Sequence, residues 1–186
     1  YIMSLKISKI RGNIDDKNYV EKIKNLKNLP QGIENSLKTE ELIQIFAKDF
    51  LSAKGSMFLG RGSSFPIALE GALKLKELSY LHAEGYPAGE MKHGPLALIE
   101  DGLPVIILAP KDKYFEKTIS NMQEVIARGG KVLLISDKHD EVINENIRFK
   151  IEMPFIDELL NPFLLTIPLQ LLAYHVALLK KCDIDK

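Results

Sequence analysis

Three ionisable residues, Glu70, Lys74 and Glu77, lie four and three positions apart in the segment "ALEGALKLKELSYL". If this segment is helical, their side chains share one face. That face is flanked by four leucines, Leu69, Leu73, Leu75 and Leu78. We therefore expect a half-enclosed Lys–Glu pair with shifted pKa values, in which a partly neutral Lys74 is nucleophilic and Glu77 moves protons. The alternative is a ladder of ion pairs in water, each worth only about 0.3–0.5 kcal/mol.

A second candidate is the segment "HAEGYPAGEMKHGPLALIEDG", residues 82–102. We interpret it as a constrained connection before a strand, where α/β enzymes often place catalytic groups. Its ionisable side chains include Glu84, Glu90, Lys92 and His93. The unperturbed pKa of histidine suits proton transfer at neutral pH, so His93 is a candidate acid or base. The alternative is a polar surface loop in which His93 is hydrogen-bonded to a backbone carbonyl.

A third candidate is "LGRGSSFP", a glycine-rich turn between a predicted strand and a predicted helix. Backbone N–H groups and the hydroxyls of Ser63 and Ser64 could bind an anion such as a sugar phosphate there. As a dinucleotide motif the turn is weak, because Phe65 occupies the place of the third glycine. The alternative is a tight turn in which a serine caps the helix.

Short apolar segments alternate with helical ones from residue 56 onward, which predicts a parallel sheet covered on both faces. The expected strands are 56–60, 104–110, 131–137 and 147–154, and the expected helices are 63–81, 114–130 and 157–180. Residues 1–40 are charged and helical in spacing, and we expect a lead-in rather than a separate domain, broken at Pro30 and Gly32.

The last predicted helix contains "PFLLTIPLQLLAYHVALL", which has no charged residue. A membrane span requires about 20 mostly apolar residues. Pro162, Pro168, Gln170 and His175 interrupt this one. We expect a helix buried against the sheet or in an oligomer interface, and no membrane association.

Composition excludes other classes of function. Lys plus Arg and Asp plus Glu number 25 each, so the chain has no basic excess and we expect no nucleic-acid partner. The single cysteine, Cys182, cannot form an internal disulfide and fits a reducing, cytoplasmic compartment. The histidines are scattered, so we expect neither a metal site nor a metal cofactor. The first residue is Tyr1, and no secretory leader pattern follows, so we expect a piece of a longer cytoplasmic protein.

The candidate segments together resemble one family. "ALEGALKLKELSYLHAEGYPAGEMKHGPLALI", "PVIILAP", "ARGGKVLLISD" and "PLQLLAYHVALLKKCDIDK" are similar to the second sugar-isomerase (SIS) domain of the glutamine–fructose-6-phosphate aminotransferases, also called glucosamine-6-phosphate synthases. The resemblance runs from about residue 36 to the end of the chain. It implies a three-layer αβα sandwich around a parallel sheet, with the sugar-isomerase domain at 41–186. It also implies a part in making glucosamine 6-phosphate from fructose 6-phosphate and glutamine, without a cofactor.

The resemblance also implies roles for individual residues. Lys74 matches the family lysine proposed to form a Schiff base with the open-chain sugar, and Glu77 matches the base that moves a proton between C1 and C2. His93 matches the histidine assigned to ring opening in a neighbouring subunit, which implies a homodimer. In the family the turn that matches Ser63 and Ser64 is not the principal phosphate site.

The family's enzymes also have a glutaminase domain, a first SIS domain and a C-terminal tail. The resemblance matches none of these parts to residues of this sequence, so we expect the chain alone to be inactive. A sugar-phosphate-sensing SIS module without catalysis and a related deglycase are the alternative functions.

Overall fold

The structure is a computed structural model that describes residues 1–137, 145–154 and 156–185. Within the predicted domain 41–186, residues 138–144, 155 and 186 therefore lie outside the described residues. One parallel sheet forms the centre, with its strands in the order β2-β1-β3-β4-β5. The strands are β1 (Gly55–Gly60), β2 (His82–Pro87), β3 (Pro104–Leu108), β4 (Lys131–Ser136) and β5 (Phe149–Glu152). Four of them lie where the sequence predicts strands.

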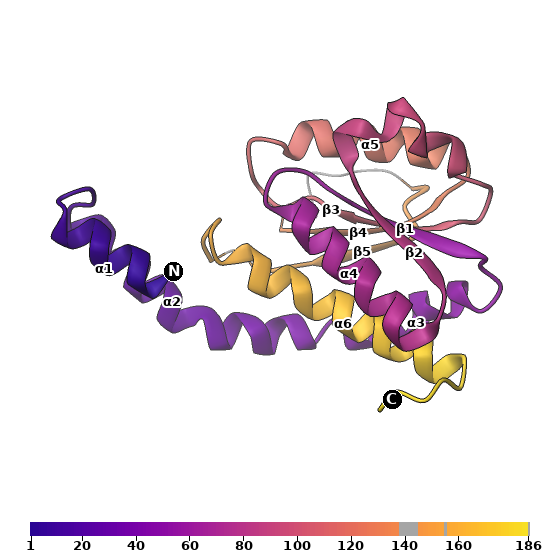
Figure 1. Ribbon diagram of the computed structural model, residues 1–186, viewed down its shortest axis with the longest axis horizontal. Helices are drawn as coiled ribbons and strands as arrows, with labels where there is room; N and C mark the ends of the chain where they lie inside the picture. The colour runs from indigo at the N-terminus through magenta and orange to yellow at the C-terminus, as the bar shows by residue number, and fades with distance from the viewer. Residues whose placement is uncertain (138–144, 155, 186) are drawn as a thin grey trace.

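Helices cover both faces of the sheet (Figure 1). The helix α5 (Phe115–Ala127) lies on one face, and α3 (Glu40–Ala47), α4 (Ser64–Ser79) and α6 (Asn161–Leu179) lie on the other. Successive strand residues point to opposite faces. Accordingly, Met57 packs in the cluster with α5, whereas Phe58 packs in the cluster with α3, α4 and α6. The predicted three-layer αβα sandwich is confirmed.

The apolar helix α6 lies inside this arrangement. By length and composition it could cross a bilayer, but half of its most apolar stretch is buried within the protein. It packs against α4, α3 and α2 (Asp16–Leu37). The expectation of a helix buried against its own domain is confirmed, although it begins at Asn161 rather than at 157 because a turn precedes it.

The predicted break in the lead-in is wrong. Helix α2 continues through Pro30, although proline removes one backbone hydrogen bond. Packing against the domain offsets that loss: Leu29 and Ile33 contact the core cluster, and Gly32 is buried where a Cβ would lie 2.5 Å from Ile156 Cδ1. A larger side chain at position 32 would therefore require Ile156 to shift.

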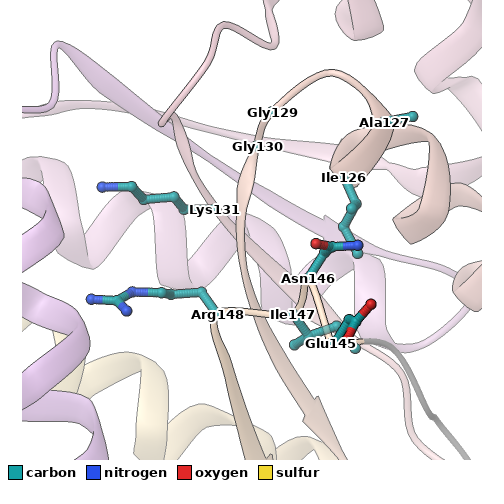
Figure 2. Close-up of a pocket in the computed structure, with 9 residues that line it drawn as sticks. All are labelled: Ile126, Ala127, Gly129, Gly130, Lys131, Glu145, Asn146, Ile147 and Arg148. Atoms are coloured by element: carbon teal, nitrogen blue, oxygen red, sulfur yellow. The ribbon is translucent and has the colours of Figure 1, made fainter.

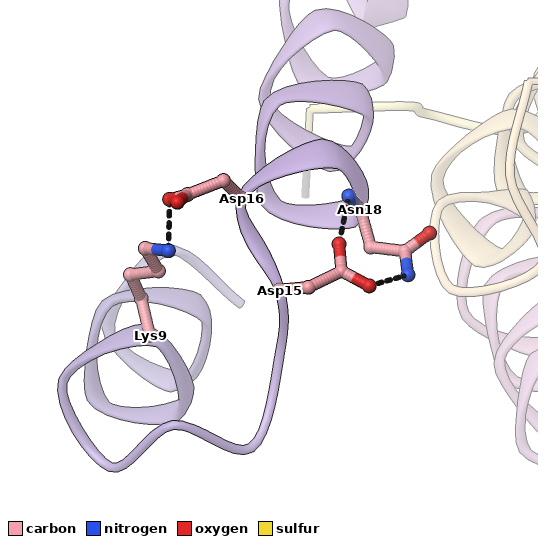
Figure 3. A network of polar contacts seen from close by, with 4 residues as sticks. All are labelled: Lys9, Asp15, Asp16 and Asn18. Atoms are coloured by element: carbon pink, nitrogen blue, oxygen red, sulfur yellow. Dashed lines mark hydrogen bonds and ion pairs between the residues drawn. The ribbon is translucent and has the colours of Figure 1, made fainter.

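The N-terminal end of α2 is built by local polar contacts (Figure 3). Asp15 caps the helix by accepting hydrogen bonds from the backbone N–H and the side-chain amide of Asn18, at 2.7 and 2.8 Å. Lys9 of α1 (Ile2–Ile10) forms an ion pair with Asp16. Figure 1 shows α1 and the first part of α2 extending away from the sheet.

The segment 82–102 is more ordered than the sequence predicts. It opens with the edge strand β2 and continues through two short 3-10 helices, η2 (Ala88–His93) and η3 (Pro95–Leu98). The prediction of a connection without a strand is wrong, since edge strands tolerate proline at their ends. Gly85 also has a packing reason, because a Cβ there would lie 2.9 Å from the backbone of Leu69 in α4.

Candidate active site

The three ionisable residues of α4 do share one face. Lys74 Nζ lies 2.6 Å from Glu77 Oε2 and 3.9 Å from Glu70 Oε1. The opposite face of α4 is fixed in the core by Ala68, Ala72, Leu75 and a close approach at Gly71, where a Cβ would lie 2.8 Å from Leu169. The core therefore holds the polar face outward at a defined rotation of the helix.

The expected partly neutral Lys74 is wrong for this structure. The hydrogen bond to Glu77 raises the pKa of Lys74 above its ordinary value, so its amine is protonated. Enclosure by leucines fails because Leu69 and Leu73 are 45% and 43% exposed, and only Leu75 is fully buried. A neutral amine at this position would need a further surface that covers the face of α4.

His93 is presented away from its own domain. The η2 helix is anchored by Ala88 and Met91, which are both buried in the cluster with α5. His93 itself is 76% exposed, and its ionic neighbour is Glu90, with 4.0 Å between Nε2 and Oε2. Gly94 follows with φ +140°, a conformation that only glycine adopts readily.

The structure does not bring His93 to the α4 pair. Within the described residues, neither Lys74 nor Glu77 hydrogen-bonds to His93 or forms an ion pair with it. Glu77 precedes the amino end of β2 and His93 follows its carboxyl end, and a strand of this length spans about 20 Å. In addition, η2 packs against α5, on the other face of the sheet from α4.

The turn before α4 lies at the topological switch point of the sheet. From β1 the chain continues to one side through α4 to β2, and from β3 it continues to the other side through α5 to β4. Ligands of open α/β sheets bind outside the carboxyl ends of the strands at such a point. Ser63 and Ser64 are therefore in a position where ligand binding is common.

The two serines differ in their surroundings. Ser63 is the N-cap residue of α4, as the serine-cap interpretation predicts, but its exposed side chain makes no capping hydrogen bond. Ser64 is 2% exposed, and its Oγ has no hydrogen-bond partner within the described residues. The backbone amides of Ser64 and Phe65 are already bonded to Arg61 and Gly62 at 3.0 and 3.3 Å, so the turn has fewer amides for an anion than its sequence suggests.

The sequence interpretation did not single out Arg61. Its Nη1 donates to Asn121 Oδ1 of α5 at 3.1 Å, and its guanidinium lies 5.9 Å from the ring centre of Tyr114. The sequence signal that could have identified it is an arginine between two glycines in "GRGSS". Glycines on both sides allow unusual backbone conformations, which can direct a long side chain toward a neighbouring segment.

A pocket of about 610 Å³ lies elsewhere, at the amino ends of β4 and β5 (Figure 2). Lys131 and Arg148 point to the same side of it, and both bond to Asp49, at 3.4 and 3.1 Å. The pocket contains none of the candidate residues, and Asp49 offsets its positive charge. Among the described residues, no group of three His, Cys, Asp or Glu side chains is placed to hold a metal ion.

Comparisons of this chain with protein families, with curated proteins and with solved structures agree on one family. A family model described as "SIS domain" matches residues 49–180. The chain is 47% identical over 185 residues to a glutamine–fructose-6-phosphate aminotransferase (isomerizing) of Bartonella quintana, and the match covers 99% of this chain and 30% of that relative. The chain thus spans less than a third of the length of the curated relatives it matches.

Two solved structures extend the comparison. The C-terminal domain of glucosamine-fructose-6-phosphate aminotransferase from Francisella tularensis matches with a TM-score of 0.94 at 43% identity, covering 100% of this chain and 52% of that chain. A glucosamine-6-phosphate deaminase from Thermotoga maritima matches with a TM-score of 0.66 at 26% identity, covering 96% of this chain and 49% of that chain.

Proposed function

The chain belongs to the SIS domain family, and on that premise we propose that it is the second sugar-isomerase domain of a glutamine–fructose-6-phosphate aminotransferase. That enzyme makes glucosamine 6-phosphate from fructose 6-phosphate and glutamine, and this domain supplies groups for the ketose-to-aldose step. The observation that carries the proposal is the α4 ion pair, with Lys74 Nζ 2.6 Å from Glu77 Oε2, held outward on a rigid helix.

Lys74 and Glu77 divide the carbonyl chemistry in this proposal. Lys74 must lose its proton before its amine attacks C2 of the open-chain sugar, and Glu77 is the carboxylate in contact to accept that proton. The hydroxyl of the resulting carbinolamine leaves as water with this proton, which gives the Schiff base and restores the carboxylate. Ammonia derived from glutamine then adds to C2 of this Schiff base and the amine of Lys74 leaves, which gives the C2 imine of the sugar. Glu77 moves a proton from C1 to C2 of that imine, which gives the aldose glucosamine 6-phosphate. An unprotonated amine is favoured when another surface covers this face and excludes water.

His93 opens the sugar ring in the site of a neighbouring subunit in this proposal. Support comes from its position, since it is exposed and separated from its own chain's α4 pair by the length of β2. A two-fold dimer would supply each active site with one His93 from across the interface. We therefore propose a homodimer.

Ser63 and Ser64 are proposed as contacts to the sugar phosphate. The buried, unpartnered Oγ of Ser64 supports this role, because buried hydroxyls normally have a partner. The hydroxyl of Ser63, which is exposed at the switch point, can donate to a phosphate oxygen. The preceding SIS domain of the whole protein is proposed to hold the principal phosphate contacts.

We also propose the wider setting of the domain. Residues 1–40 are a helical lead-in from preceding SIS and glutaminase domains, and 41–186 form the sugar-isomerase domain. The protein is cytoplasmic, works without a metal or organic cofactor, and has neither a nucleic acid nor a membrane as partner.

The experiment is a product assay on the full-length protein with fructose 6-phosphate and glutamine. Glutamine-dependent formation of glucosamine 6-phosphate is expected. A deaminase or deglycase, which the Thermotoga maritima likeness keeps as second candidate, would release ammonia from glucosamine 6-phosphate and make no use of glutamine. Binding of sugar phosphate without turnover of either kind would indicate a sensing module.

A further inference from the structure

One polar contact joins η2, which carries His93, to α5, and a second joins α5 to the turn before α4. Lys92 Nζ lies 3.0 Å from Glu124 Oε1. Arg61 Nη1 donates to Asn121 Oδ1 at 3.1 Å. Asn121 and Glu124 are three positions apart on α5 and so lie on the same face. We call these four residues the α5 clasp.

The arginine half of the α5 clasp supports the start of η2. A Cβ at Gly89 would lie 2.8 Å from Arg61 Nη2, so the guanidinium lies directly against this backbone. Asn121, which accepts the bond from Arg61, is 8% exposed. The guanidinium of Arg61 therefore lies between Asn121 of α5 and the backbone of η2 at Gly89.

The lysine half of the clasp supports the end of η2. Lys92 immediately precedes His93, and Glu124 is three-quarters buried. Between the two halves, Met91 is 1% exposed in the cluster with α5. The η2 helix is thus bonded to α5 near its last residue, lies against the Arg61 guanidinium near its first residues, and has a buried side chain between these two places.

Among the described residues, the side chain of His93 forms no hydrogen bond, and its one ionic contact is weak. Its ring is 76% exposed, and the nearest carboxylate oxygen, on the exposed Glu90, is 4.0 Å away. Its direction must come from the residue on each side. Lys92 is bonded to α5, and Gly94 takes φ +140°, which turns the chain sharply after the histidine.

We propose that Glu124 and Asn121 of α5 are positioning residues for His93, and that the α5 clasp sets the angle at which His93 reaches the neighbouring active site. The inference rests on the proposed role of His93 in ring opening. Catalytic groups must be held close to the productive geometry, so a loosened clasp reduces turnover without touching the substrate.

The test uses the full-length enzyme and a double-mutant cycle. Glu124→Gln removes the charge and keeps the size of the side chain, and it is measured alone and combined with His93→Ala. Glu116→Gln is the matched control, because Glu116 is an exposed carboxylate on the same helix. Hydrogen exchange of the amides of residues 88–94 reports directly on whether η2 is loosened.

Glu124→Gln is expected to lower kcat roughly two- to fivefold, the size expected for one partly exposed ion pair, with little change in KM. Exchange in residues 88–94 should become faster, and Glu116→Gln should change neither quantity. His93→Ala alone should lower kcat about 10²-fold, and Glu124→Gln should add nothing to it. The charge swap Lys92→Glu with Glu124→Lys should recover most of the lost turnover.

Two results would overturn the inference by itself: the same fold-loss from Glu124→Gln with and without His93, or no change in both kcat and exchange. A normal kcat for His93→Ala would instead refute the role of His93 in the proposed function, and the inference would fall with it.

Discussion

Asp157 joins the lead-in helix to the domain, and its removal gives a measurable prediction. Its carboxylate is 6% exposed, just before α6, and accepts hydrogen bonds from Lys22 Nζ at 2.5 Å, Asn25 Nδ2 at 3.3 Å and the Leu159 amide at 3.0 Å. Lys22 and Asn25 belong to α2. Asp157→Asn keeps the size of the side chain and removes its charge.

The expected loss is about 1–2 kcal/mol in the free energy of unfolding. A hydrogen bond to a charged group contributes about 1.5–3 kcal/mol. The expected loss lies in the lower part of that range and below it, because Lys22 is 33% exposed and can turn into water when its partner is lost. A loss of this size lowers the folded-to-unfolded ratio by roughly 5- to 30-fold.

The loss should depend on pH. Burial raises the pKa of Asp157, but the hydrogen bonds from Lys22, Leu159 and Asn25 outweigh it and hold that pKa below the ordinary value of 3.8. A carboxyl whose folded pKa is depressed stabilises the protein above its unfolded pKa, and this stabilisation is lost as pH falls through the folded value. The difference between wild type and Asp157→Asn should be constant from about pH 5 to 8 and shrink below about pH 4.

The assay is urea unfolding followed by circular dichroism, since the chain has no tryptophan for fluorescence. Glu158→Gln is the control, because Glu158 is the exposed neighbouring carboxylate. Equal stability of wild type and Asp157→Asn at pH 7 would refute the reasoning. A difference of the same size at pH 3 would refute its electrostatic part.

Borohydride added to the full-length enzyme with fructose 6-phosphate should trap the sugar on Lys74, because reduction fixes a Schiff base; an adduct on another lysine would remove Lys74 from the mechanism. The 186-residue chain alone should make no glucosamine 6-phosphate, even with free ammonia, because it spans 30% of its relatives' length; product from the purified chain would contradict this. His93→Ala subunits exchanged with Glu77→Gln subunits should regain activity, because one site of the mixed dimer carries neither defect. No recovery after proven subunit exchange would mean that His93 serves its own chain.

Local patterns in the sequence were sufficient to predict the three layers of the fold and the polar face of α4. The strands β1, β3 and β4 are short apolar segments bounded by glycine, proline or charged residues, and β5 alternates apolar and charged residues; both patterns are typical of strands. The spacing of Glu70, Lys74 and Glu77 places their side chains on one face of any α-helix that contains them. These features depend on neighbours in the chain, so the sequence alone predicted them.

Features that depend on distant residues were not predictable. The strand β2 is half-buried and contains glycine and proline, and its Gly85 is explained only by the close backbone of Leu69. Helix α2 continues through Pro30 because Gly32 packs on residues more than a hundred positions away. The ionisation of Lys74 depends on what covers Leu69 and Leu73, and spacing cannot report that.

The α4 pair is the centre of the proposed activity, and one substitution tests it most directly. In the full-length enzyme, kcat for glucosamine 6-phosphate formation is compared between wild type, Glu77→Gln and the exposed control Glu116→Gln. Loss of the proton-transfer base predicts a kcat lower by about 10²–10⁴-fold in Glu77→Gln, with a modest change in KM and a normal control. Near-normal turnover of Glu77→Gln would contradict the assignment of Glu77 as the base and leave the α4 pair without its proposed chemistry.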